Sequence, residues 1–192
     1  MRGARGDSGF WILDPIFRIG DPRSGISQTS GASAIISGMQ YWLMKSEPDT
    51  YSIDDLKAKS PAMWEGCRNW TVRNFMKNEM KIGDLAFFYH SSCVPPGVIG
   101  TMEVVSESYP DPTQFDPKSD YYDPKSTKEK PRWVVVDVKF VEKFPRLVEL
   151  SELRVEPGLE KMLVNRRGQR LSIMPVTPEE WKIVEKMARR KG

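Results

Sequence analysis

Hydrophobic and polar residues alternate over several short segments of the chain, which is the pattern of β-strands that bury one face. The strongest alternation runs from Leu85 to His90, where residues 85, 87 and 89 face one side of the strand and residues 86, 88 and 90 face the other. The same pattern, together with runs of β-branched and aromatic residues, predicts further strands at residues 40–44, 97–105, 133–140 and 171–174. The chain is therefore expected to be rich in short strands.

Apolar side chains spaced three and four residues apart predict short helices between these strands. Helices are predicted at residues 52–57, at residues 71–79, at residues 150–154 and from Thr177 onward. Val72, Phe75 and Met76 form the buried stripe of the second helix. Thr177 and Glu180 have the spacing of a capping box, in which each side chain accepts a hydrogen bond from the backbone N–H of the other residue.

Residues 106–131 form a long segment without a helical or strand period. Asp-Pro pairs begin at residues 111, 116 and 123, and the segment carries Tyr109, Tyr121 and Tyr122. Loops of this length inside a compact domain are usually functional or disordered, and the tyrosines favour an ordered lid. The pattern as a whole predicts an α+β fold, a small β-barrel of five or six strands with mixed pairing and short flanking helices.

The first 38 residues differ from everything that follows them. They are rich in Gly, Ser, Arg and Asp and show no sustained period. The apolar patch from Phe10 to Phe17 is interrupted by Asp14 and Pro15, and the aspartates argue against a transit peptide. We expect residues 1–38 to be a disordered or loosely packed extension, upstream of a single folded domain that spans residues 39–192.

Charge is distributed unevenly along the chain. The formal net charge is only +3 and the isoelectric point is about 8.8, which is less basic than a protein that coats nucleic acid. From residue 154 to the end, however, ten Lys or Arg stand against five Glu. Arg166, Arg167 and Arg170 lie in one predicted turn of this segment and are candidate phosphate contacts.

Cysteine and histidine usage restricts the chemistry of the chain. Two cysteines, Cys67 and Cys93, do not make a disulfide framework, and they are expected to be small apolar fillers in an intracellular protein. The chain has one histidine, so the usual four Cys or His ligands of zinc cannot be assembled in one subunit. No apolar run reaches the roughly 20 residues needed to cross a bilayer. We therefore expect a soluble protein without a metal, a cofactor or a membrane partner, located in the cytoplasm, or in the nucleus if the source is a eukaryote.

Candidate site residues occur where predicted strands end and in the polar loop that carries Trp64. They are Lys45, Ser46, Glu47, Trp64, Arg68, Asn69, Tyr89, His90, Ser91, Ser92 and Tyr109. A small barrel is able to gather these positions around one cavity. Aromatic faces combined with charged and neutral hydrogen-bonding groups suit a flat, polar, heteroaromatic ligand such as a nucleobase.

Several of these residues also have a purely structural interpretation. Trp64 is equally well explained as a core tryptophan, and Asn69 as the N-cap of the following helix. Lys45 to Glu47 is equally consistent with a solvated charged turn. His90 invites the role of a general base beside Ser91, but neighbouring residues on an extended chain point to opposite faces. We expect His90 to make one hydrogen bond in the cavity wall, and we expect no catalytic residue.

Several sequence segments resemble the EVE domain family. They include YWLMKSEPDTYSIDDL from residue 41, WEGCRNW from residue 64, the FFYHS motif from residue 87 and RGQRLSI from residue 167. The resemblance extends from Met39 to about Ala188. It implies a PUA-like fold, related to the YTH readers of modified RNA, that binds a modified base without a known reaction. Compared with the family pattern, Ser92 stands where asparagine is common, Trp70 where tyrosine is usual, and Met174 where glutamine is frequent.

Three functional hypotheses follow. The first is a non-catalytic reader that binds a modified cytosine or another modified base of DNA or RNA, with the basic turn contacting phosphates. The second is a small hydrolase of a modified nucleoside or amide, suggested by resemblance to the ASCH group, in which Lys45, Glu47 and His90 act as acid and base groups. The third is a protein-interaction module that uses the basic C-terminal surface. The sequence leaves the oligomeric state open.

Overall fold

The computed structural model describes residues 38–190 of the chain. The extension predicted at residues 1–38 lies, except for Gly38, outside the described residues.

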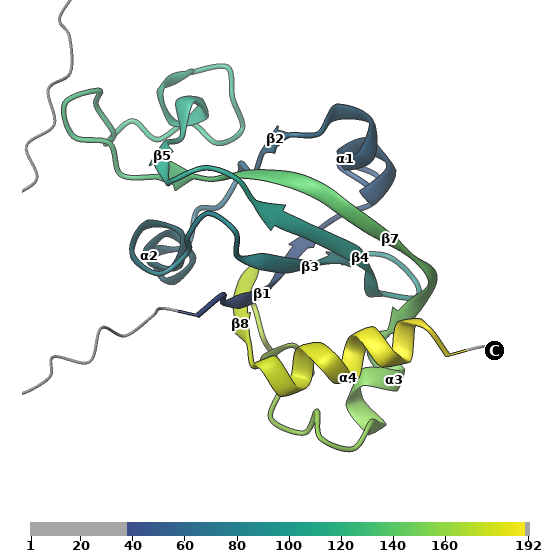
Figure 1. Ribbon diagram of the computed structural model, residues 1–192. Helices are drawn as coiled ribbons and strands as arrows, with labels where there is room; N and C mark the ends of the chain where they lie inside the picture. The colour runs from purple at the N-terminus through teal and green to yellow at the C-terminus, as the bar shows by residue number, and fades with distance from the viewer. Residues whose placement is uncertain (1–37, 191–192) are drawn as a thin grey trace, which may run out of the picture. The chain divides into compact units, whose positions relative to one another are not determined.

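A mixed six-stranded sheet forms the centre of the described residues and curls into a half-barrel (Figure 1). Its strand order is β2-β7-β4-β3-β1-β8, and β1 and β3 are the parallel pair among antiparallel neighbours. The strands are β1 (Tyr41–Ser46), β2 (Ala62–Met63), β3 (Leu85–His90), β4 (Gly97–Val104), β7 (Asp137–Glu149) and β8 (Ile173–Val176). The predicted α+β class, with five or six strands of mixed pairing curled as a small barrel, is confirmed as six strands in a half-barrel, with β2 and β8 as the two sheet edges.

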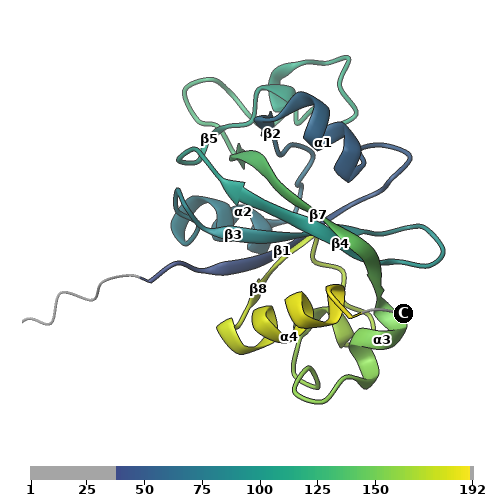
Figure 2. The same cartoon turned by 45° about the vertical axis from the view of Figure 1, so that its right-hand side comes forward.

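Short helices cover both faces of the sheet (Figure 2). They are α1 (Ile53–Lys59), α2 (Trp70–Asn78), α3 (Leu150–Val155), α4 (Pro178–Ala188) and the 3-10 turns η1 (Pro112–Phe115) and η2 (Leu163–Asn165). One buried cluster joins the even positions of β3 to α1 and α2, and a second joins the odd positions to α3 and α4. The alternation predicted for residues 85–90 is thus confirmed, because the strand is buried on both faces.

The predicted helix starts are also observed. The hydroxyl of Thr177 accepts from the Glu180 N–H, and the Glu180 carboxylate accepts from the Thr177 N–H. Ser52 and Asp55 form the same box at the start of α1. These interactions are local in sequence, which is why residue spacing alone locates them.

The strand predicted at residues 133–140 is wrong in its bounds. The structure divides it into β6 (Val134–Val135) and the start of β7, and β7 continues to Glu149. Pairing with β4 keeps this charged segment extended, and Pro145 falls between the paired residues Lys143 and Val148, where no ladder N–H is needed. Gly100 allows β4 to approach β7 closely, because a Cβ at this position would lie 2.3 Å from the carbonyl oxygen of Glu142.

The long segment at residues 106–131 is folded around the buried Gln114. Its side-chain amide donates to the carbonyl oxygens of Asp111 and Trp133, and its oxygen accepts from the backbone N–H groups of Arg132 and Trp133. The short strand β5 (Tyr109–Pro110) pairs with β6 at the start of the segment. These bonds give the segment a defined conformation without a long element of secondary structure.

Candidate ligand-binding cavity

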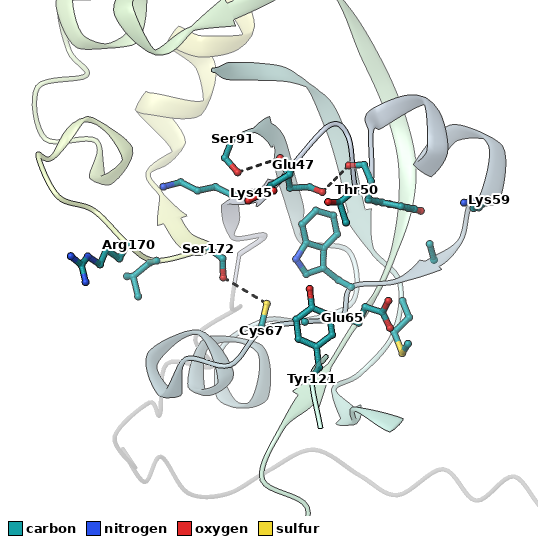
Figure 3. Close-up of a pocket in the computed structure, with 17 residues that line it drawn as sticks. Lys45, Glu47, Thr50, Lys59, Glu65, Cys67, Ser91, Tyr121, Arg170 and Ser172 are labelled. Carbon is teal, nitrogen blue, oxygen red and sulfur yellow. Dashed lines mark hydrogen bonds between the residues drawn. The ribbon is translucent and has the colours of Figure 1, made fainter. Parts of the chain in front are cut away.

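A cavity of about 620 Å³ lies where the ends of β1 and β3 meet the loop between β2 and α2 (Figure 3). This volume is within the range of small-molecule binding sites. The lining comes from residues 45–51, from residues 59–67, from Ser91, from Tyr121 and from residues 170–172. Five segments that are distant in sequence therefore contribute to one wall.

Trp64 is both a cavity residue and a core residue. Its side chain lines the cavity, yet only 6% of the residue is exposed, and its ring packs edge-on against Phe88 with 5.5 Å between the ring centroids. Its backbone N–H donates to the carbonyl oxygen of Val136. Among residues 38–190, no group hydrogen-bonds the indole N–H. The sheet therefore fixes the ring, while one part of it remains available to the cavity.

The end of β1 supplies three of the predicted residues to the cavity. Lys45, Ser46 and Glu47 all line it. The Ser46 hydroxyl donates to the Tyr51 carbonyl oxygen at 2.7 Å, which fixes the turn after the strand. Burial lowers the pKa of Lys45 because the ammonium group loses water, and its Nζ lies 5.8 Å from the centroid of the Tyr89 ring.

Ser91 and Ser92 differ in their relation to the cavity. Ser91 lines it, and its backbone N–H donates to the Ser46 carbonyl oxygen. Ser92 does not line it, but its hydroxyl donates to Glu47 Oε1 at 2.7 Å. Ser92 thus orients a carboxylate of the cavity wall.

Arg68 does not line the cavity, but it holds a residue that does. Its guanidinium donates to Asp111 Oδ2 at 2.7 Å, to the Thr113 hydroxyl at 2.9 Å and to the Tyr121 carbonyl oxygen. Tyr121 lies against Gly66, where a Cβ would be 2.7 Å from the ring carbon Cζ and where the backbone φ is +83°. Arg68 and Gly66 together place the Tyr121 ring in the wall, with its hydroxyl toward the cavity (Figure 3).

The structure places Asn69 and Tyr109 outside the cavity lining, which corrects their predicted location. The Asn69 side-chain oxygen accepts from the N–H groups of Thr71 and Val72, so Asn69 is the N-cap of α2. The Tyr109 hydroxyl donates to Asp137 Oδ1 at 2.6 Å, and burial together with this hydrogen bond raises the pKa of Tyr109. Both side chains stabilise the segments that surround the site.

Tyr89 and His90 also lie outside the cavity lining, which corrects the expectation for both. Tyr89 packs in the cluster under α3 and α4, and burial raises its pKa to about 12. His90 Nε2 accepts a long hydrogen bond of 3.4 Å from the Ile53 N–H at the start of α1. The acid and base groups of the hydrolase hypothesis are therefore divided, with Lys45 and Glu47 in the wall and His90 outside it.

The three predicted phosphate contacts are exposed arginines. Arg170 lines the cavity, and Arg166 and Arg167 precede it in the same turn. Within residues 38–190, none of the three forms an ion pair. Of the three, Arg170 therefore brings an unpaired positive charge to the cavity wall.

Sequence reasoning missed several lining residues. They include Thr50, Tyr51, Lys59, Glu65, Tyr121 and Ser172. Of these, Tyr51 has a buried hydroxyl without a hydrogen-bond partner among the described residues. The sequence signal was present only as tyrosines in the segments around residues 51 and 121.

Cys67 packs with its Sγ 3.7 Å from the Ser172 hydroxyl, and burial raises the pKa of this thiol to about 11, consistent with an inert filler.

Comparison with known proteins decides the family. The model of the EVE domain matches residues 40–187. The chain belongs to the EVE domain family. It is 44% identical to human thymocyte nuclear protein 1 over 162 residues, which cover 75% of this chain and 72% of the human protein. It is 41% identical to the chicken protein of the same name over 192 residues, covering 86% of this chain and 78% of that protein.

Solved structures of similar proteins share the fold. A crystal structure of a Pseudomonas putida protein has a TM-score of 0.75 at 47% identity and covers 77% of this chain and 99% of its own. A crystal structure of human THYN1 in complex with DNA that contains 5-methylcytosine has a TM-score of 0.74 at 41% identity, covering 80% of this chain and 99% of its own.

The three departures from the EVE pattern lie in different places. Ser92 touches Glu47 of the cavity wall, whereas Trp70 is half exposed at the start of α2. Met174 is buried against α3 and α4, on the sheet face opposite Trp64, so its predicted position near the cavity is wrong.

None of the helices within residues 38–190 is long and apolar enough to span a membrane.

Lowering the pH from 7.5 to 5.5 is expected to destabilise this EVE domain through His90. Burial first, and then repulsion by Lys143, lower the pKa of His90, while Asp54 acts in the opposite direction. Between the folded pKa and the unfolded value of about 6.5, the unfolded chain binds more protons, so stability falls as the pH falls through this window. Protonation of Nε2 also removes the acceptor for the Ile53 N–H.

The measurement is the free energy of unfolding in urea at closely spaced pH values. His90 is the single histidine of the chain, so a His90→Gln variant is expected to show a flatter profile between pH 5.5 and 7.5. Equal slopes for the two proteins in this window contradict the assignment.

Proposed function

We propose that this EVE-domain protein is a reader that binds one modified base of DNA, flipped out of its strand, in the cavity beside Trp64. The observation that carries the proposal is a cavity of about 620 Å³ whose lining joins aromatic side chains to polar groups and includes Arg170, which forms no ion pair within residues 38–190. The relation to human THYN1, whose crystal structure contains 5-methylcytosine DNA, supports a modified cytosine as the ligand.

Aromatic surface in the cavity supplies the main attraction for a base. Extrusion of a base costs a few kcal/mol, and stacking on one aromatic ring returns about 1–3 kcal/mol. Trp64 and Tyr121 both contribute rings to the lining. Because Trp64 is fixed by core packing and Tyr121 by Arg68, little side-chain entropy is lost when the ligand enters.

Polar groups in the wall supply the selectivity. The Tyr51 hydroxyl is buried without a partner within residues 38–190, so it gains a hydrogen bond when a polar edge of the base arrives. Glu47 and Lys45 offer an acceptor and a donor near the end of β1. Arg166, Arg167 and Arg170 are suited to contact the phosphates, which orient the strand without reading its sequence. Binding rather than hydrolysis is favoured because His90 lies apart from Lys45 and Glu47.

The test is a binding screen against oligonucleotides of one sequence that differ in a single base. The set contains cytosine, 5-methylcytosine, 5-hydroxymethylcytosine and N6-methyladenine, each in single- and double-stranded DNA and in RNA. We expect at least one modified DNA to bind roughly tenfold more tightly than its unmodified counterpart, which is about 1.4 kcal/mol. Equal affinity for every base, or no binding, rejects the proposal.

The Tyr51→Phe variant sharpens the same screen. Loss of one hydrogen bond of about 0.5–1.5 kcal/mol is expected to weaken binding of the preferred oligonucleotide by roughly 2- to 13-fold. The free protein is expected to keep or gain stability, since the hydroxyl has no partner among the described residues. Tyr109→Phe is the matched control, because its hydroxyl is bonded to Asp137: it is expected to lose stability and to retain affinity.

A further inference from the structure

Arginines and aromatic rings alternate in a row of contacts that leads from α2 to the cavity. We call this row the arginine–aromatic ladder, and its members are Arg73, Trp70, Arg132, Trp133, Arg68 and Tyr121. Each guanidinium carbon in this ladder lies 5.2–5.9 Å from the centroid of a neighbouring ring, and the centroids of Trp70 and Trp133 are 4.7 Å apart. The ladder ends at Tyr121, which lines the cavity. It therefore connects an external surface to the candidate site.

The inner part of the ladder is explained by folding. Arg68 pairs with the buried Asp111, and Arg132 pairs with Asp123, whose carboxylate also accepts from the Trp133 indole N–H at 2.7 Å. These interactions hold the segment at residues 106–131 against the start of α2. They account for Arg68, Arg132 and Trp133 without a ligand.

The outer part is not explained in this way. Trp70 is 50% exposed although it is among the largest apolar side chains of the chain, and its indole N–H has no hydrogen-bond partner within residues 38–190. Arg73 has no carboxylate partner in the same range: its guanidinium donates to the Arg132 carbonyl oxygen and to the Asn74 side-chain oxygen. The half-exposed Trp70 ring lies between Arg73 and Arg132. Trp70 therefore offers a partner a face for stacking, and Arg73 offers it a positive charge.

We propose that the Trp70 and Arg73 surface binds the nucleotides that flank the modified base on the same strand, and this rests on the proposed function. A base stacks on Trp70 and a phosphate meets Arg73. Single-stranded nucleic acid is bound elsewhere by the same combination of rings and cations, because every base has a stacking face and every link carries a negative charge. Trp133 is itself buried, but its ring contacts with Trp70 and Arg68, and the contact of Arg68 with the cavity residue Tyr121, fix the position of the Trp70 and Arg73 surface relative to the cavity.

Two ligands separate this surface from the cavity. One is the mononucleotide of the base preferred in the screen, and the other is a pentanucleotide with that base at its centre. Trp70→Ala is expected to weaken binding of the pentanucleotide by roughly 5- to 150-fold, which corresponds to one lost stack, and to leave binding of the mononucleotide unchanged. Trp70→Phe, which keeps a ring, is expected to restore most of the affinity.

Arg73→Ala is expected to weaken the pentanucleotide and to reduce the slope of log Kd against log salt concentration by roughly 0.7, the value of one phosphate contact on a single strand. Lys77→Ala is the matched control, since it removes the same charge from an exposed position of α2. The Lys77→Ala variant is expected to change the salt slope by less than half as much as Arg73→Ala does.

The outcomes distinguish the two proposals. If Trp70→Ala loses equal affinity for both ligands, or loses none for either, the proposed binding surface is rejected and the proposed reader function is not affected. A wild-type protein that binds neither ligand overturns the reader function and the surface with it. Unchanged mononucleotide affinity also shows that the variants are folded, so a loss confined to the pentanucleotide supports the surface directly.

Discussion

Replacing Arg68 by alanine is expected to destabilise the protein by about 3–5 kcal/mol, the range measured when one member of a buried ion pair is removed. Asp111 is fully buried, and the variant leaves its carboxylate without a counter-charge. The substitution also removes the donors to Thr113 and to the Tyr121 carbonyl oxygen. The expected result is a lower free energy of unfolding together with a displaced Tyr121.

The measurement is urea unfolding of the variant, of the wild type and of two companions. Arg68→Ala with Asp111→Asn is expected to recover part of the loss, because the amide no longer carries a buried charge. Arg68→Lys keeps the charge but loses the planar fork that bonds Asp111, Thr113 and Tyr121 together, so an intermediate loss is expected. If the double variant is less stable than the single one, the buried charge is not the cause.

Local patterns account for much of the predicted fold. The alternation in β3 and the capping boxes at Ser52 and Thr177 depend on residues only a few positions apart, and all are observed. The bounds of β7 were missed because its extended form depends on pairing with β4, some forty residues earlier in the chain. A charged segment with a proline carries no local signal for a strand.

Most of the predicted site residues that line the cavity follow the ends of strands. Lys45 to Glu47 lie at the end of β1 and Ser91 follows the end of β3, and because these two strands are parallel neighbours their ends meet at one edge of the sheet. Tyr89 and His90 were assigned to the same cavity, although the alternation already placed them on opposite faces of β3. His90 does lie on the Trp64 side, but the first N–H of α1 occupies its ring nitrogen.

Long-range contacts explain the residues that sequence reasoning could not assign. Arg68 was predicted to touch the ligand, whereas its partners Asp111 and Tyr121 follow it by 43 and 53 residues. Tyr51 and Tyr121 belong to unrelated segments and share a cavity only in the folded chain. No spacing rule relates such positions, because the intervening chain is irregular.

Trp64→Leu is expected to weaken binding of the preferred modified oligonucleotide by roughly 5- to 150-fold, since leucine fills part of the space but offers no ring for a base to stack on. Trp64→Phe keeps a smaller ring and is expected to lose less. Affinity is measured by titration at a temperature where circular dichroism shows each variant folded. The melting temperature must be measured as well, because Trp64 is 6% exposed and packs on Phe88, so both variants are expected to lose stability.

Met76→Ala separates stability from recognition. Met76 is fully buried in the same core cluster as Trp64 but does not line the cavity. Its truncation is expected to destabilise the protein by about 2–5 kcal/mol and to leave the affinity of the folded protein close to that of the wild type. If Trp64→Leu loses no more affinity than Met76→Ala at equal folded fraction, Trp64 acts only in the core and a base does not stack on it.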